Sequence, residues 1–352
     1  TEKTFTDSQR IEHAKHHFAS MFAETPPPVA SITISNGLIN GTATYSMPTS
    51  FMAIINLNSL GVGVASQAQI ASLPSPCILL LEPSQISLII NGNSQLKTGC
   101  AVHVNSSNSE ALYLNSVSKI VATDICVKGG YKLNGGSTSS PTPKTGCPVK
   151  SDPLASVPEP TYGACNFTDF VVPTGQTKTL NPGVYCKKLE IQGGATVTLL
   201  PGVYVFPDAP LLINAGGRLV GDGVMLYFKD AAGYLSANSG AVVQLEAPHS
   251  GTYKGIVMFH SRSATSQLAP AHIVNSDSSS FLEGMIYAPN GKLMLNSNST
   301  LNSTADYTAV VARAMEINSL GTFVGNANYS GSTPVSDKVN LSPSAVGVRL
   351  VK

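Results

Sequence analysis

A short motif that returns, within contiguous stretches, at intervals of 21 to 24 residues most constrains how this chain can fold. Each copy has an aliphatic residue, then Asn or Gln, then a small residue, and an aliphatic or aromatic residue a few positions later. Short β-rich pieces such as GVYVF, GVMLYF and GIVMFH lie between the copies, each after Gly or a turn. The amide residues of the eight copies are Asn91, Asn115, Gln192, Asn214, Asn238, Asn275, Asn296 and Asn318.

The spacing predicts a mainly β fold, a right-handed parallel β-helix (solenoid), over residues 72–331. One repeat cannot bury its inward side chains, but repeats stacked about 4.8 Å apart form continuous sheets around an aliphatic column. A period near 22 residues favours a three-sided helix. Asn suits each corner because it tolerates left-handed backbone and its amide can bond to the next Asn. We therefore expect the eight amide residues to form a structural ladder.

Composition agrees with a folded, weakly charged chain. Hydrophobic residues make up 42%, which is enough for a core, so a disordered Ser/Asn-rich tract is disfavoured. Charged residues make up only 12%, and the net charge is +1. Such a balance excludes electrostatic capture of nucleic acid or anionic lipid.

The flanks and two insertions do not follow the repeat. Residues 1–71 predict a small α+β unit: a Thr6/Gln9 capping box opens a helix, and Asn36-Gly37 joins two alternating segments into a hairpin. Residues 132–160 form an insertion rich in Pro, Ser and Gly, and residues 248–271 form a second. Residues 332–352 are predicted to be a C-terminal tail whose strand caps the last repeat.

Six cysteines fall into three pairs separated by about one repeat. Cys77 and Cys100 are 23 residues apart, whereas the pairs Cys126/Cys147 and Cys165/Cys186 are each 21 apart. Residues one repeat apart stack within reach of a disulfide, so sequential pairing is favoured. Zinc is disfavoured because no C-x-x-C occurs. Disulfides imply an oxidising compartment, although the chain begins without an export signal.

No catalytic, cofactor-binding or metal-binding residue is predicted. Right-handed β-helices include polysaccharide lyases and hydrolases, but the carboxylates here are scattered. The best local groups are Asp222 and Asp230 with Lys229, followed by Asp277 with Glu283, and neither recurs at one-repeat spacing. Ser250 near His249 and Ser261 near His260 are interpreted as surface groups. The helical pair His13 and His17 is interpreted as solvated, with a metal pair at their i to i+4 spacing as the alternative.

A carbohydrate- or ice-binding solenoid is the stronger alternative. Ice binding would need regular Thr-x-Thr ranks, and we find the pattern only at Thr196 and Thr198. Sugar binding would need exposed aromatic rings. The candidates are Tyr185, Tyr204, Tyr227, Tyr253 and Tyr287, several of which alternation places inward.

The order of the segments resembles the TadG-like proteins of bacterial Tad (Flp) pilus-assembly systems that carry a C-terminal β-helical region. The likeness lies in TDSQRIEHAKHHF, VASITISNGLINGTATYSMPTSFMAIINL, SPCILLLEP, SDPLASVPEP and the IQGGATVTLLPGVYVF repeats. It implies a minor-pilin-like part in pilus assembly or attachment. It also implies an N-terminal inner-membrane anchor, which this chain lacks, and a bulk outside the cytoplasm. No Asp-x-Ser-x-Ser metal motif of a von Willebrand type A module is present.

We therefore predict a noncatalytic structural component of a pilus-assembly or adhesion apparatus, in the periplasm or at the cell surface. Its predicted partners are pilus or other envelope proteins, with a surface glycan as a further candidate. It needs no cofactor and binds no nucleic acid. Membrane contact is expected only through an N-terminal tether to the inner membrane in the full-length protein.

Overall fold

The computed structural model describes residues 7–22, 28–35, 38–49, 55, 58–71, 76–238, 240–264, 271–275, 279–296, 300–325 and 347–350. The chain is mainly β, with 53% strand and 4% helix. It divides into two compact units. The small unit comprises Thr1–Leu73 and Pro343–Lys352, and the large unit comprises Pro74–Ser342.

The small unit is one helix beside an antiparallel sheet. Helix α1 (Asp7–Ser20) precedes strands β1 (Val29–Ser35), β2 (Leu38–Pro48) and β3 (Ser59–Ala71). Strands β1 and β2 form the predicted hairpin, with Ser35 opposite Leu38, whereas Asn36-Gly37 and Thr6 lie outside the described residues. Strand β29 (Gly347–Leu350) pairs with β3. The C-terminal strand therefore belongs to the sheet of the small unit, and the prediction that it caps the last repeat is wrong.

The large unit consists of short strands that pair in parallel with the strand one repeat away. Its first block, residues 76–140, contains β4 (Pro76–Leu80), β5 (Leu88–Ile90), β6 (Gln95–Thr98), β7 (Ala101–Val104), β8 (Leu112–Leu114), β9 (Lys119–Val121), β10 (Asp124–Val127), β11 (Tyr131–Leu133) and β12 (Thr138–Ser140). Because β11 and β12 continue the parallel ladders, the repeat extends into the predicted insertion at 132–160.

The second block, residues 167–325, holds the remaining strands. They are β13 (Phe167–Val172), β14 (Thr177–Leu180), β15 (Gly183–Ile191), β16 (Thr196–Leu199), β17 (Gly202–Phe206), β18 (Leu211–Ile213), β19 (Arg218–Gly221), β20 (Val224–Phe228), β21 (Leu235–Ala237), β22 (Val242–Glu246), β23 (Ile256–His260), β24 (His272–Val274), β25 (Phe281–Asn296), β26 (Thr300–Leu301), β27 (Thr308–Asn318) and β28 (Thr322–Gly325). Strand β23 lies inside the predicted second insertion, 248–271, which is therefore partly regular.

The predicted right-handed β-helix solenoid is wrong. Hydrogen-bonded pairs form a closed circuit through β15, β17, β20, β23, β25, β24, β21 and β18, so the unit contains a closed eight-stranded parallel β-barrel with further sheets. The long strands β15 and β25 close the circuit because each pairs with two successive strands. The spacing of a repeat predicts which strands lie next to each other, but it does not predict whether the sheets that they form join into a closed barrel.

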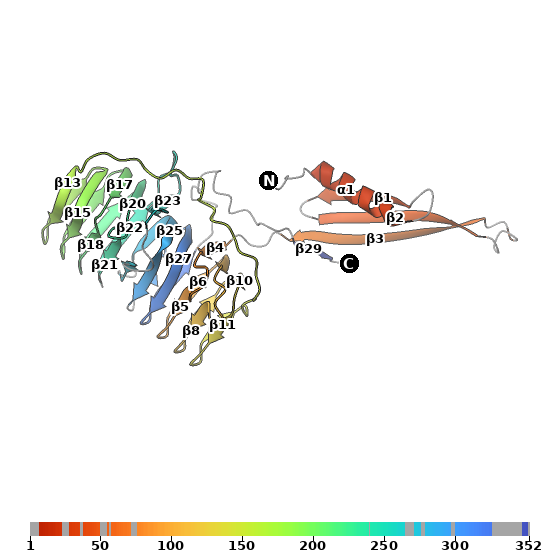
Figure 1. Cartoon of the computed structure of the whole chain (residues 1–352), viewed down its shortest axis with the longest axis horizontal. Helices are drawn as coiled ribbons and strands as arrows, with labels where there is room; N and C mark the ends of the chain where they lie inside the picture. The colour runs from red at the N-terminus through yellow and green to blue at the C-terminus, as the bar shows by residue number, and fades with distance from the viewer. Residues whose placement is uncertain are drawn as a thin grey trace. The chain divides into compact units, whose positions relative to one another are not determined.

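The order of the strands also departs from the order of the sequence. Strand β27, near the end of the second block, pairs with β4 and β5 at the start of the first block. The first block therefore follows the second in space, and β10 and β13 lie at opposite ends of the paired strands (Figure 1). The chain between the blocks must then run the length of the unit.

Aromatic side chains fill the interior of the second block. Tyr185 stacks on Tyr204 and on Phe206 at centroid distances of 5.9 Å, and Phe206 stacks on Phe228 at 5.0 Å. All four rings are fully buried. They come from strands one repeat apart, and parallel register brings equivalent side chains into contact. Burying such rings contributes much of the hydrophobic stabilisation of the unit.

The corner residues form broken ladders. Asn115 donates to Asn91, Asn238 to Asn214, and Asn318 to Asn296, at 3.3, 3.1 and 2.8 Å. Asn275 Oδ1 instead accepts from the backbone N–H of Asn296 at 2.7 Å, and Gln192 Oε1 from that of Thr174 at 3.3 Å.

The predicted left-handed backbone lies after the amide residue. None of the eight ladder residues has a positive φ, whereas Ser116 and Val117, like Ser319 and Leu320, do. The glycines two positions after Gln192, Asn214 and Asn238 also have positive φ. The residues one or two positions after the amide therefore make the turn, and in three repeats a glycine, which adopts this region most easily, takes the second of these positions. The Asn side chain links repeats.

Candidate functional site: a strap and the groove beside it

Residues 148–164, named the strap here, join the two blocks along the outside of the large unit (Figure 1). From β10 to β13 there are nine successive strand pairings, which is about 43 Å at the usual spacing near 4.8 Å. A segment of this length can reach roughly 55 to 60 Å when extended. The proline-rich strap is thus long enough to cover the distance in an extended form.

A disulfide fixes each end of the strap. Cys147, just before it, is bonded to Cys126 of β10, and Cys165, just after it, is bonded to Cys186 of β15. The third disulfide joins Cys77 and Cys100 in the first block. The Cα separations are 5.7 to 5.8 Å, so all three bridges join the sequential pairs that the spacing predicts.

The first part of the strap is bound through its backbone. Asn105 donates to the carbonyl of Lys150 at 2.8 Å and accepts from its N–H at 2.9 Å. The guanidinium of Arg262 donates to the carbonyls of Leu154 and Val157, at 2.9 and 2.7 Å. A side chain that satisfies backbone groups in this way substitutes for a neighbouring strand.

Glu159 is the centre of the strongest contacts. One carboxylate oxygen accepts from Tyr227, from Ser261 and from Lys229, at 2.9, 2.7 and 3.2 Å. The other accepts from the backbone N–H of Arg262 at 2.8 Å. Burial alone would raise the pKa of Glu159, but these hydrogen bonds lower it to about 2. The carboxylate is therefore ionised at neutral pH and holds the strap against β20 and β23.

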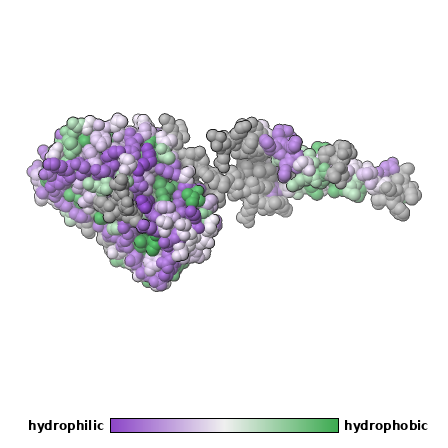
Figure 2. Space-filling model, viewed as in Figure 1, coloured by the Kyte–Doolittle hydropathy of each residue, from purple (hydrophilic) through white to green (hydrophobic). Residues whose placement is uncertain are grey.

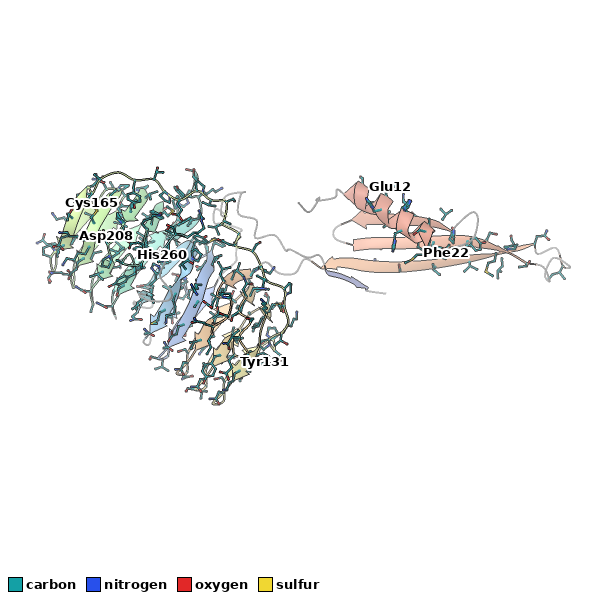
Figure 3. All side chains as sticks on the ribbon, viewed as in Figure 1. Glu12, Phe22, Tyr131, Cys165, Asp208 and His260 are labelled. Atoms are coloured by element: carbon teal, nitrogen blue, oxygen red, sulfur yellow. A yellow bond between two sulfur atoms is a disulfide. The ribbon has the colours of Figure 1, made fainter. Side chains whose placement is uncertain are left out.

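A groove of about 730 Å³ opens beside the end of the strap. Its walls include Tyr162, Lys187, Asp208, Lys229 and Asp230 together with the Cys165–Cys186 bridge. Tyr162 is 40% exposed. Figure 3 shows Cys165 and Asp208 near the same end of the paired strands, with His260 nearer their middle. An exposed ring among lysines and carboxylates can stack on a sugar ring and bond to its hydroxyls.

The predicted sugar-stacking tyrosines do not form this groove. Tyr185, Tyr204, Tyr227 and Tyr287 are fully buried, and Tyr253 is half-buried. Tyr227 and Tyr287 instead donate to the strap, the second to Asp152 at 2.6 Å. Tyr162 was not among the predicted candidates, because it lies two residues beyond the predicted insertion at 132–160 and outside the repeat from which the candidates were taken.

The threonine rank is wider than the sequence analysis found, but it ends after two strands. Thr177 and Thr179 of β14 lie in register with Thr196 and Thr198 of β16. The next strand, β19, places Arg218 and Val220 at the same positions. A large charged side chain interrupts the flat, regular threonine surface on which ice binding was predicted to depend.

Several of the groups considered for catalysis make contacts with other parts of the protein. Lys229 pairs with Glu159, and Asp230 accepts from the N–H of Ala232 at 2.8 Å. His260 faces the interior, whereas Ser261 binds the strap. Asp277 lies outside the described residues. The structure does bring Asp222 and His249 together with Glu246, and Glu246 lies in register with Glu283, which follows the second insertion.

No protein-family model, curated protein or solved structure matches this chain. Across the described ranges, no helix is long and apolar enough to span a membrane. The three disulfides fit an extracytoplasmic protein, because cytosolic thiols are kept reduced.

Proposed function

We propose that this protein is a noncatalytic structural component of a bacterial Tad/Flp pilus-assembly or adhesion apparatus, comparable to a minor pilin. The observation that carries the proposal is the strap, whose two ends are fixed by disulfides and whose middle is bound to both blocks. Such a device resists separation of the stacked strands. Resistance of this kind suits a part that transmits or withstands force outside the cell.

The small unit supplies a surface for a protein partner. A groove of about 570 Å³ is lined by Phe18, Phe22, Tyr45, Val62 and Val64. Val64 is 63% exposed and Leu60 is 50% exposed, on strand β3. Figure 2 shows apolar side chains on the surface of this unit. We propose that a protein of the pilus apparatus covers this face, because apolar patches favour protein contacts over solvent.

Affinity capture from the native envelope tests this proposal. We expect the tagged chain to retain pilus-apparatus proteins after crosslinking, and Val64→Asp to lose most of them. Val117→Asp is the matched control, because Val117 is equally exposed, at 63%, but lies in the large unit. Capture of no pilus-apparatus protein, or equal capture by both variants, would contradict the proposal.

A surface glycan is the second candidate ligand, supported by the exposed ring of Tyr162 in the groove beside the strap. A glycan array probed with the full chain should show binding that Tyr162→Ala abolishes. Incubation with pectin and alginate should release no product, because we propose a binding role and no catalysis. Reproducible cleavage would overturn that part of the proposal.

A further inference from the structure

Two carboxylates and an imidazole converge on one corner of the large unit. Asp222 lies between β19 and β20, Glu246 ends β22, and His249 follows in the loop before β23. Their potential ligand atoms all lie within 4.8 Å of one another. His249 Nε2 is 2.5 Å from Asp222 Oδ1. Three potential donor atoms, one from residue 222 and two from residues 246–249, thus lie close enough together to bind one ion.

The same corner concentrates negative charge. Glu283 of β25 lies in register with Glu246, and its carboxylate accepts from the N–H of Asp306 at 3.2 Å. Among the described lysines and arginines, none forms an ion pair with Asp222, Glu246, Glu283 or Asp306. A cation would therefore relieve repulsion here.

We propose that Asp222, Glu246 and His249 bind a divalent transition-metal ion, with Zn²⁺ as the best match. Zinc accepts both imidazole nitrogen and carboxylate oxygen as ligands, whereas Ca²⁺ and Mg²⁺ prefer oxygen ligands alone. Two tetrahedral ligand atoms at about 2.0 to 2.1 Å from zinc are about 3.3 Å apart. His249 Nε2 and Asp222 Oδ1, now 2.5 Å apart, must therefore move apart by about 0.8 Å to bind the ion.

The exposure of the ligands defines the kind of site. The side chains of Asp222 and His249 are 67% and 56% exposed, so both can adjust without disturbing the core. Three protein ligands leave a fourth position of the ion for water or for a group of a partner. The bound ion ties the loop before β23 to the neighbouring repeats. The site is therefore an exchangeable surface site, distinct from the groove beside the strap.

Calorimetric titration of the full chain with ZnCl₂ tests the proposal. His13→Ala/His17→Ala serves as the background, because these helical histidines are a rival pair for metal. In that background we expect one equivalent of Zn²⁺ to bind saturably. His249→Ala and Glu246→Gln should each weaken binding at least tenfold. Glu110→Gln, an exposed carboxylate on another repeat, should leave binding unchanged.

Two results would overturn the proposal. One is the absence of saturable Zn²⁺ binding in the background protein, and the other is equal affinity with and without the His249 imidazole. A parallel titration with CaCl₂ distinguishes a site with an imidazole ligand from nonspecific binding of cations by the carboxylates. Calcium should bind at least a hundredfold more weakly, and equal binding of both ions would contradict the assigned ligands. Circular dichroism should show unchanged folding, since the substituted side chains are not part of the core.

Discussion

The Nε2 of His272 lies 3.0 Å from the Nδ1 of His260, and both rings are buried in the large unit. The backbone N–H of Leu235 donates to His272 Nδ1 at 3.2 Å, so this nitrogen carries no proton. His272 therefore donates from Nε2 to His260, which in turn donates from its own Nε2 to the carbonyl of Asp230 at 3.1 Å. Both rings are neutral, and one tautomer satisfies every nitrogen.

This pair predicts loss of stability in mild acid. Burial lowers the pKa of both imidazoles, and for His272 the proximity of His260 lowers it further. The unfolded chain takes up protons as the pH falls below about 6.5, while the folded pair does not. The free energy of unfolding should thus be constant above that pH and decrease below it. Urea denaturation at pH 7.5, 6.5 and 5.5 measures the effect.

Replacement of one ring provides the control for the acid prediction. His272→Phe leaves the Leu235 N–H without its acceptor and should cost about 1 to 3 kcal/mol at pH 7.5. The decrease between pH 7.5 and 5.5 should become smaller, although His103, whose pKa burial lowers to about 4, continues to contribute. An unchanged pH dependence in the variant would show that the pair is not its source.

Glu159→Gln should release the strap. The amide NH₂ of the glutamine is a donor and cannot accept the hydrogen bonds that one carboxylate oxygen of Glu159 accepts. We therefore expect the free energy of unfolding to fall by about 2 kcal/mol. Limited proteolysis with peptide mapping should show faster cleavage within residues 148–164. Glu110→Gln removes an ion pair with Lys132, with side chains 37% and 49% exposed, and should change the free energy of unfolding far less, because solvent screens such a pair. Equal protease resistance of the two variants would argue against the strap being held by Glu159.

Removing either of the two disulfides at the ends of the strap should raise the conformational entropy of the denatured chain by the same amount. Both close loops of 21 residues, for which the chain-entropy estimate is about 3 kcal/mol each. Cys126→Ala/Cys147→Ala and Cys165→Ala/Cys186→Ala should therefore lower the free energy of unfolding by similar amounts in urea denaturation. A large difference between them would mean that folded-state contacts of the strap dominate.

The corner ladder predicts a graded loss. Asn115 donates to Asn91 at 3.3 Å and accepts from Asn134 at 3.0 Å, whereas Asn134 makes only the second of these bonds. Asn115→Ala should therefore cost about 1 to 2 kcal/mol, and Asn134→Ala about half as much, because each bond contributes on the order of 1 kcal/mol. Thermal unfolding of the two variants measures the ratio. A larger loss for Asn134→Ala would contradict a ladder that links repeats.

Several features could be predicted from the sequence because they depend on neighbours along the chain or one repeat away. The β1–β2 hairpin, the parallel pairing of strands and the three disulfides are of this kind. The spacing of one repeat is enough to bring Cys126 beside Cys147, and this does not depend on how the strands at the two ends of the large unit pair. The resemblance to TadG-like proteins stays a prediction, and the functional proposal rests on the strap and the small unit.

The carboxylate cluster shows where this reasoning fails. Glu246 and Glu283 are 37 residues apart, because an insertion lengthens that one repeat, yet they lie in register on adjacent strands. Glu159 lies in the predicted insertion at 132–160, and Tyr162 lies in the irregular stretch just after it, so the repeat pattern pointed to neither residue. Irregular segments have no period, so their positions follow from the surface on which they pack.

The amino-acid sequence alone determined the local rules: which residues turn, which face inward and which cysteines stack. Those rules act over one repeat, where hydrogen bonding and side-chain burial decide between few alternatives. Tertiary structure alone decided that β27 meets β4, that eight strands close into a barrel and that β29 joins the small unit. Every parallel edge offers the same backbone donors and acceptors, so only the complete packing selects which edges meet.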